Sequence, residues 1–399
     1  MIIRNGYIRH DGRKGIRNIV VVAYLVQCAT HVAQKIRADF GSDVHLIGFT
    51  GCYPNDHANR MMASLCTHPN VGGVVLVSLG CESFPRNSLL QELTESGRPV
   101  ELITIQESGG TAKSISRGKK AVSTILTKIK DAPTEPMKLE ELVVGTVCGG
   151  SDATSGITAN PAVGLFFDRL IEEGGTGIFE ETGELIGCEQ VMLQRSITPE
   201  VGLDVVRAVD KAASYYTTMG HGSFAPGNAE GGLTTQEEKS MGAYAKSGNS
   251  PICGIIRPGQ CPPDKGLYLL DVVPDGEPRF GYPNINDVAE IAELAASGCH
   301  VVLYTTGRGS VAGSAIAPVI KICANPTTYR ALKDDMDIDA GRVLESRATL
   351  DEVGTEIFEL VMKVAGGQLS KPEVLGHQEF ELPYKTFDID DTSNRRNRG

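Results

Sequence analysis

Residues 143–164 read Val-Val-Gly-Thr-Val-Cys-Gly-Gly-Ser-Asp-Ala-Thr-Ser-Gly-Ile-Thr-Ala-Asn-Pro-Ala-Val-Gly. The apolar, β-branched run at the start ends at Cys148. Two glycines and several small polar residues follow, and Asn160-Pro161 opens an apolar-periodic segment. This order predicts a strand, a glycine-rich turn and a helix. In parallel α/β sheets, ligands bind where strands end and helices begin. The loop between Cys148 and Asn160, rich in small polar side chains, is therefore the first candidate for a functional site.

The alternation of strand-like and helix-like segments extends from this stretch in both directions. It begins with a valine-rich run at 18–26, after a basic, glycine-punctuated lead-in at residues 6–17. A polar, proline-containing segment at 132–141 predicts a linker, and helices at about 327–336 and 349–363 close the pattern. The sequence therefore predicts an α/β protein with two Rossmann-like parallel-sheet domains, at 1–131 and 142–385, and a frayed tail at 386–399.

Composition limits the class of protein. The 399 residues carry a formal net charge of −11, which argues against a nucleic-acid partner because phosphate binding needs a basic face. No apolar run reaches membrane-spanning length, so no membrane association is expected. The ten cysteines include no C-x-x-C pair, and the start of the chain does not resemble a signal peptide. These features predict a reduced, cytoplasmic protein.

Several predicted strands end in the same way, with glycines followed by hydroxyl, thiol or carboxylate side chains. Glycines at such turns let backbone N–H groups point at an anion, and the dipole of the following helix favours its binding. The alternative is that these glycines only make tight turns. The residues that we expect to bind substrate are Ser108, Gly110, Thr111, Ser151, Ser155, Thr158, Asn160, Asn228, Thr234, Thr235, Arg308 and Ser310.

Three members of this set have a specific alternative role. Arg308, between two glycines, is a candidate carboxylate clamp, because a guanidinium binds carboxylate with two parallel hydrogen bonds. It could equally form a structural pair with an acidic neighbour. Thr234 and Thr235 precede a predicted helix and could either face an anion or simply cap that helix. No loop matches a phosphate-binding or dinucleotide-binding motif.

Three cysteines at strand ends are candidate metal ligands. Cys52, Cys81 and Cys148 each end a predicted strand, and Glu82 follows Cys81 directly. Mixed sets of thiolate and carboxylate can hold Fe²⁺ or a related ion, although the spacing is not that of a zinc finger. The alternative for each thiol is burial as a small apolar group.

Four residues are candidates for catalysis. Asp152 lies in the loop after the first quoted strand, and Glu181 follows another strand. His221 lies in a glycine-flanked loop, and Lys239 lies near a predicted helix start. Carboxylate and imidazole groups are common proton carriers in enzymes. The alternatives are that Glu181 stabilises a helix N-terminus and that His221 is exposed and idle.

Short motifs that occur in order along nearly the whole chain resemble those of a known family. They include Gly51-Cys52, Gly80-Cys81-Glu82, Gly109-Gly110-Thr111, Cys148 to Asp152, Ser155 to Pro161, Glu181-Thr182, Pro226-Gly227-Asn228, Gly231 to Thr235 and Thr305 to Ser310. Together they resemble the large domain of the altronate dehydratase/galactarate dehydratase family. The resemblance implies a lyase that eliminates a β-substituent from a 2-hydroxy acid to give a 2-keto acid. It also implies a divalent metal, Fe²⁺ or another such as Mn²⁺.

The resemblance leaves the substrate and the assembly open. Many members of the family carry a small N-terminal SAF-type domain, whereas this chain starts at the large domain, so a separate small SAF-domain subunit and an oligomer are expected. The first interpretation is a sugar-acid dehydratase of the altronate or galactarate type. The alternatives are the large subunit of (2R)-3-sulfolactate sulfo-lyase, which releases sulfite and pyruvate, and a non-catalytic subunit that needs a partner.

Overall fold

The valine-rich runs of the first 130 residues form a four-stranded parallel sheet. It is seen in a computed structural model that describes residues 1–220, 226–275 and 285–387. Alternate residues of its first strand face opposite sides, so Val20 packs with α1 and α4 whereas Val21 packs with α2. The strand order is β4-β3-β5-β6, and the elements are β3 (Ile19–Tyr24), α1 (Thr30–Arg37), β4 (Val44–Gly48), α2 (Asp56–Cys66), β5 (Val71–Ser78), α3 (Arg86–Glu95), β6 (Val100–Thr104) and α4 (Thr111–Ile129).

The second sheet has seven parallel strands in the order β10-β11-β9-β8-β12-β13-β14. Strand β8 lies between β9 and β12, so the order in which strands are added along the chain reverses at β8. In parallel sheets of this kind, ligands bind at the carboxyl end of the strands where the order reverses. The strands are β8 (Val143–Cys148), β9 (Thr176–Phe179), β10 (Ile252–Ile256), β11 (Gly266–Leu270), β12 (Val301–Thr306), β13 (Val319–Cys323) and β14 (Ile338–Asp339).

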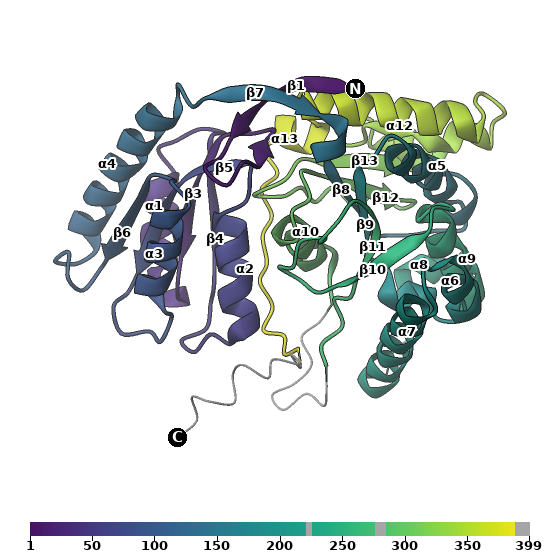
Figure 1. Ribbon diagram of the computed structural model, residues 1–399, viewed down its shortest axis with the longest axis horizontal. Coiled ribbons are helices and arrows are strands. Elements are labelled where there is room, and N and C mark those ends of the chain that lie inside the picture. The colour runs from purple at the N-terminus through teal and green to yellow at the C-terminus, as the bar shows by residue number, and fades with distance from the viewer. Residues whose placement is uncertain (221–225, 276–284, 388–399) are drawn as a thin grey trace.

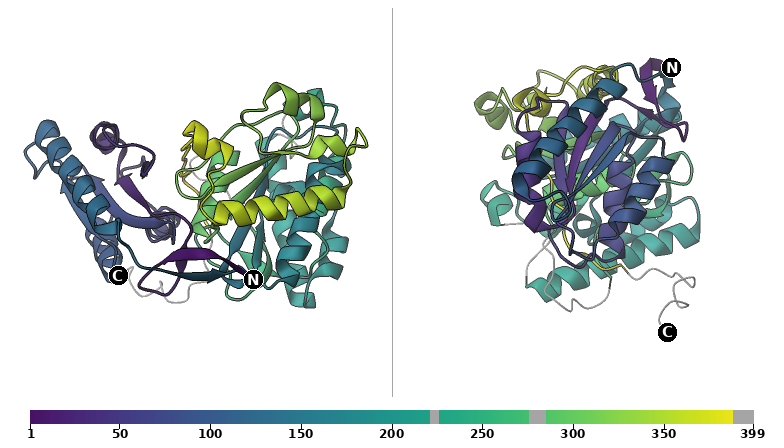
Figure 2. Two further views of the ribbon diagram at one scale, coloured as in Figure 1. Left: turned by 90° about the horizontal axis from the view of Figure 1, so that it is seen from above. Right: turned by 90° about the vertical axis from the view of Figure 1, so that its left-hand side faces the viewer.

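Helices cover both faces of this second sheet (Figures 1 and 2). Val144 of β8 packs with α5 and α12 on one face, whereas Val147 packs with α10 on the other. The helices are α5 (Ala159–Glu172), α6 (Glu189–Arg195), α7 (Pro199–Met219), α8 (Pro226–Glu230), α9 (Gln236–Lys246), α10 (Asp287–Ala296), α11 (Pro326–Ala331), α12 (Leu350–Ala365) and α13 (Lys371–Leu375).

One apolar core joins the two sheets. Leu65 of α2 and Leu294 of α10 belong to the same buried cluster, so α10 lies between the second sheet and the first domain. The chain after α13 runs as an extended segment between α2 and α10 (Figure 1). Lys385 of this segment is buried and pairs with Glu293 at 2.7 Å, and its carbonyl accepts a hydrogen bond from Asn55 Nδ2.

The lead-in at 6–17 and the predicted linker at 132–141 include strand residues that the sequence pattern did not indicate. These segments contain β1 (Ile2–Ile8), β2 (Lys14–Gly15) and β7 (Thr134–Lys138), which form a separate antiparallel sheet in the order β2-β1-β7. Pro136 is tolerated because β7 is an edge strand. The predicted helix at 327–336 is also shorter, because α11 ends at Ala331.

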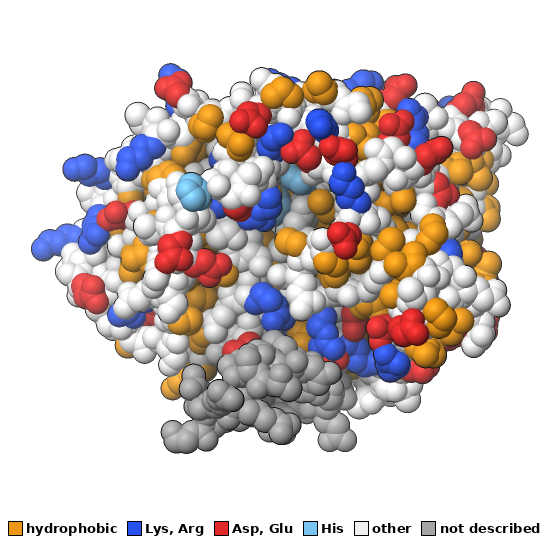
Figure 3. Space-filling model, in the orientation of Figure 1, with side chains coloured by type: hydrophobic (Ala, Val, Ile, Leu, Met, Phe, Trp, Pro, Cys, Tyr) orange, Lys and Arg blue, Asp and Glu red, His pale blue; other side chains and the backbone are white. Residues whose placement is uncertain are grey.

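Three general properties follow from the described residues. No helix among them is long and apolar enough to cross a membrane. On the face drawn in Figure 3, acidic and basic side chains are interspersed over both parts of the molecule. All ten cysteines are free thiols.

Candidate active site

The site is built where three buried segments converge at the carboxyl end of β8. Cys148 is the last residue of β8, and Gly150 turns the chain with a φ of +62°. Glu181 follows β9, and the short 3-10 turn after it (Thr182–Leu185) carries Glu184. Helix α9 supplies Lys239 and Lys246, which are seven residues apart and therefore point from the same face of the helix.

The side chains form a connected polar network. Lys239 Nζ donates to Cys148 Sγ at 3.0 Å and to Ser151 Oγ at 3.1 Å. Cys148 Sγ lies 3.5 Å from Glu181 Oε2, and Lys246 Nζ donates to the other oxygen of the same carboxylate. Lys239 Nζ also lies 3.8 Å from Glu184 Oε1. The loop after β8 is thus held to β9 and α9 by charged groups that are almost completely buried.

The two lysines determine the ionisation of the thiol. Burial alone would raise the pKa of Cys148, but the ammonium groups of Lys239 and Lys246 lower it below its ordinary value. Burial would lower the pKa of Lys239, yet the neighbouring Cys148 and Glu184 raise it. Both shifts favour an ion pair of thiolate and ammonium. Burial lowers the pKa of Lys246.

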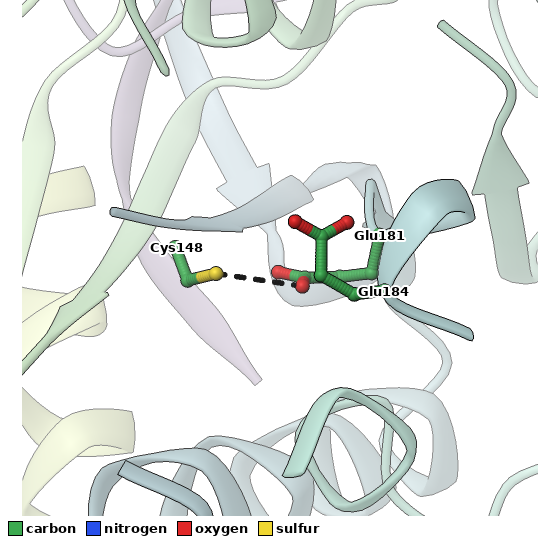
Figure 4. A group of neighbouring side chains, drawn as sticks. All are labelled: Cys148, Glu181 and Glu184. Atoms are coloured by element: carbon green, nitrogen blue, oxygen red, sulfur yellow. Dashed lines mark hydrogen bonds between the residues drawn. The ribbon is translucent and has the colours of Figure 1, made fainter. Parts of the chain in front are cut away.

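The donor set fits a divalent metal. Figure 4 shows the Cys148 thiol and the carboxylates of Glu181 and Glu184 close together, with ligand atoms that all lie within 4.8 Å of one another. Within the described ranges, this is the group of three His, Cys, Asp or Glu side chains that could hold an ion. A thiolate with carboxylates suits Fe²⁺ and related ions. Two buried carboxyl groups lie nearby, and burial together with neighbouring acidic groups raises the pKa of Glu180 and of Glu290.

The other candidate metal ligands do not join this group. Cys52 and Cys81 are exposed and lie on the first domain. Glu82 is buried, but its carboxylate accepts hydrogen bonds from Ser78 Oγ and from the Gly80 N–H at 2.8 Å. Burial would raise the pKa of Glu82, but these hydrogen bonds and Arg86 lower it. The carboxylate therefore stabilises the loop to which it belongs.

Asp152 has its hydrogen-bonding capacity occupied by the protein. Oδ1 accepts from Thr154 N and Oγ1 and from Ser155 Oγ, and Oδ2 accepts from Asn325 Nδ2 at 2.9 Å. A Cβ on Gly307 would overlap this carboxylate. Asp152 therefore ties the loop after β8 to the segment after β13 and packs against the loop after β12. Thr158 also connects this loop to the segment after β13, because its Oγ1 donates to the Ala324 carbonyl at 2.9 Å.

The remaining candidates near this loop lie around its rim. Arg308 is exposed, its N–H donates to the Gly150 carbonyl at 2.8 Å, and its guanidinium lies 3.6 Å from Glu230. The Ser310 N–H donates to Thr306 Oγ1. Asn160 is buried, and within the described residues its Oδ1 has no hydrogen-bond partner.

The other candidates occupy helix starts or lie outside the described residues. Thr235 caps α9 by accepting from the Glu238 N–H, and Thr234 Oγ1 donates to the Glu238 carboxylate. The Asn228 carbonyl accepts from two N–H groups after α8. Ser108, Gly110 and Thr111 lie at the start of α4 in the first domain, away from β8. His221 lies outside the described residues.

Sequence reasoning missed several residues of the site. Lys246 lies seven residues after Lys239, and this spacing could have indicated that both share one helix face. Asp287 and Glu290, at the start of α10, are three residues apart and reach the same acidic cluster. Glu184, three residues after Glu181, completes the group of possible metal ligands. Only the packing of α10 against β8 and β12 shows that these residues belong together.

Comparison with known proteins identifies the family. Residues 139–387 match the D-galactarate/altronate dehydratase C-terminal domain, and residues 6–130 match the second domain of D-galactarate dehydratase/altronate hydrolase. Altronate dehydratase of Bacillus subtilis is 32% identical over 94% of this chain and 76% of its own length. The (2R)-sulfolactate sulfo-lyase subunit beta of Chromohalobacter salexigens is 31% identical over 94% of this chain and 96% of its own length. Galactarate dehydratase (L-threo-forming) of Escherichia coli is 32% identical over 77% of this chain and 59% of its own length. The chain therefore belongs to the D-galactarate/altronate dehydratase family of lyases.

Proposed function

We propose that this chain removes a β-substituent from a 2-hydroxy acid and yields a 2-keto acid, with a sugar acid of the altronate or galactarate type as substrate. The convergence of Cys148, Glu181, Glu184 and Lys239 at the switch point of the second sheet carries the proposal. The names of the relatives supply the substrate class. We expect the protein to work in the cytoplasm, where free thiols persist.

The three acidic ligands would hold Fe²⁺, or Mn²⁺ in its place. A bound divalent ion would polarise the carboxylate and 2-hydroxyl of the substrate as a Lewis acid. Lys246 donates to the Glu181 carboxylate and Lys239 donates to the Cys148 sulfur, so both ligands are oriented, and the two lysines favour the thiolate form of Cys148. Such support of metal ligands by neighbouring groups is common in metal sites.

Lys239 is the proposed proton donor to the leaving group. Its ammonium is buried, protonated and hydrogen-bonded to Ser151 Oγ, at the point where the loop after β8 faces α9. A departing hydroxyl needs a proton to leave as water, and a positioned acid supplies it. Arg308 lies on the rim of the same loop and would bind the distal carboxylate of an aldaric acid.

A second candidate function is the sulfo-lyase reaction. The match to the sulfo-lyase subunit beta extends over 96% of that relative, more than over either dehydratase compared above. In that case the substrate would be (2R)-sulfolactate and the products sulfite and pyruvate. The word "subunit" in the name of that relative supports a separate small partner, which we propose to be a SAF-type subunit in an oligomeric assembly.

A substrate panel tests both candidates. The chain is purified without oxygen, loaded with Fe²⁺, and assayed with aldonic acids, aldaric acids and (2R)-sulfolactate, with and without a small SAF-type partner. Formation of a 2-keto acid from a sugar acid supports the dehydratase, and release of sulfite supports the sulfo-lyase. Turnover that depends on the partner supports the two-subunit assembly. If the complex turns over none of these acids, the chain is a non-catalytic subunit and the proposed function is wrong.

A further inference from the structure

Asp287 lies against the loop after β8 although it comes from a distant helix. It is the first residue of α10, and Tyr304 Oη of β12 donates a hydrogen bond to its Oδ2. A Cβ on Gly149 would overlap both Tyr304 Oη and Asp287 Oδ2, so this pair touches the backbone directly after Cys148. Glycine at 149 lets the hydroxyl and the carboxylate approach the loop this closely.

An acidic residue at a helix start usually caps the helix, but in α10 another residue is the cap. Asn286 caps α10, because its side chain accepts a hydrogen bond from the Ala289 N–H at 3.0 Å. Among the described residues, Asp287 Oδ1 has no hydrogen-bond partner, and the side chain is half-buried rather than enclosed. The carboxylate is therefore oriented through one oxygen and free to react through the other.

A buried lysine packs against the ring of this tyrosine. Lys321 Nζ of β13 lies 3.3 Å from the centre of the Tyr304 ring, is completely buried, and has no hydrogen-bond partner within the described residues. Burial and the neighbouring Asp287 carboxylate raise the pKa of Tyr304, so its hydroxyl stays protonated and donates to Asp287. Tyr304 itself is fully buried, and its hydroxyl touches both Asp287 and the backbone at Gly149.

Asp287 and Lys239 approach the same short loop from different elements. Lys239 Nζ contacts Cys148 Sγ from α9, and Asp287 contacts the next residue, Gly149, from α10. Elimination from a 2-hydroxy acid needs one group to accept the C2 proton and another to protonate the leaving hydroxyl. Because Lys239 is already a hydrogen-bonded ammonium, the partly open carboxylate is the available acceptor.

We propose that Asp287 is the base that removes the C2 proton and that Tyr304 is the residue that positions it, an inference that rests on the proposed function. Oδ1 of Asp287 takes the proton as the C2–H bond breaks, and its electron pair forms the C2–C3 double bond. The C3–O bond breaks and the oxygen leaves as water with a proton from Lys239. The enol then becomes the 2-keto acid, and solvent restores both groups. With sulfite as the leaving group the first step is the same, and no proton from Lys239 is needed.

Four proteins test the proposal: the wild type, Asp287→Asn, Tyr304→Phe and the control Asp351→Asn, which changes an exposed first-turn aspartate on α12. We expect Asp287→Asn to lower kcat by about 10²–10⁴-fold with little change in KM, since that is the usual contribution of a general base. Tyr304→Phe should lower kcat about tenfold, and Asp351→Asn should match the wild type. C2-deuterated substrate should show a larger isotope effect in Asp287→Asn than in the wild type.

Mn²⁺ affinity, measured by electron paramagnetic resonance, separates the base from a metal ligand. It should be unchanged within about twofold in Asp287→Asn, because that residue lies outside the proposed ligand set. Loss of Mn²⁺ binding in this variant, or turnover within about fivefold of the wild type, would overturn the proposal for Asp287. A wild-type protein that turns over no acid in the panel would overturn the proposed function and this inference together.

Discussion

Lys246 Nζ donates a hydrogen bond to Glu181 Oε1 in a place where neither side chain reaches solvent. The pair joins α9 to the segment after β9, and it lies directly behind the proposed metal ligands. Removing one partner of a buried ion pair leaves an uncompensated charge in a medium of low dielectric constant. The pair therefore couples the stability of the fold to the electrostatics of the site.

The variant Lys246→Met should lower the free energy of unfolding of the metal-free protein by about 3–5 kcal/mol, because Glu181 would be left buried and unpaired. Urea denaturation followed by circular dichroism measures the change. The double variant Lys246→Met/Glu181→Gln should recover part of the loss. Lys363→Met, which breaks an exposed pair with Glu359, is the control and should change stability by less than about 1 kcal/mol. If Lys246→Met and Lys363→Met lowered the free energy of unfolding equally, burial of the ion pair would not be the cause of the effect.

A spectroscopic prediction concerns Cys148. Co²⁺ bound by a thiolate shows a charge-transfer absorption that carboxylate ligands do not produce, so the Co²⁺-loaded protein should have this band. Cys148→Ser should lose the band and weaken Co²⁺ binding by about 10-fold or more, as the loss of a metal ligand does in other sites. Cys52→Ser and Cys81→Ser should retain the band, because both thiols are exposed on the first domain. A band that survives in Cys148→Ser would remove this cysteine from the ligand set.

Gly149 gives a steric prediction. Alanine at this position would place a methyl group on the Tyr304 hydroxyl and the Asp287 carboxylate. We expect Gly149→Ala to cost about 1–3 kcal/mol of stability by overpacking. It should also lower kcat, since Asp287 is displaced. Gly41→Ala is the matched control, because a Cβ there meets nothing within 4 Å. Thermal unfolding and steady-state kinetics of the two variants compare them, and equal behaviour would show that the contact at Gly149 is not tight.

Part of this architecture could be predicted from local pattern alone. The run that ends at Cys148 is a buried strand because its side chains are apolar and β-branched, and the glycines after it mark the turn. In contrast, β1 and β7 carry polar residues and a proline, and they are strands only because they pair with each other across the chain. Such pairing has no local signature in sequence.

The candidate site divides in the same way. Cys148, Glu181 and Lys239 could be proposed from their positions after strands and at a helix start, and the fold places them together. Asp287 and Lys246 could not, because their importance arises from the crossing of α9 and α10 over the end of β8. Asp152 shows the opposite case. Its chemistry suggested catalysis, but its oxygens are bonded to Thr154, Ser155 and Asn325. Of these partners only Asn325 is distant in sequence, and its approach to Asp152 follows from the packing of the sheet.

Stability at acidic pH should depend on His57, which lies between the two domains. Its side chain is 2% exposed, and within the described residues neither ring nitrogen has a hydrogen-bond partner. Burial, together with the nearby cations Lys385 and Arg60, lowers the pKa of His57 from 6.5 to about 3. The folded protein thus keeps this histidine neutral over a range in which the unfolded chain takes up a proton.

The sign of the effect follows from this difference. Since the unfolded state binds the extra proton, the free energy of unfolding should fall as the pH drops from about 6.5 towards 3, by up to about 1.4 kcal/mol per pH unit for this one group. His57→Phe should flatten that slope, because phenylalanine fills the space beside Phe387 and cannot be protonated. His10→Asn, at an exposed position, is the control. Urea denaturation at several pH values between 4 and 7 measures the slopes, and a slope in His57→Phe as steep as in the wild type would show that other groups cause the acid sensitivity.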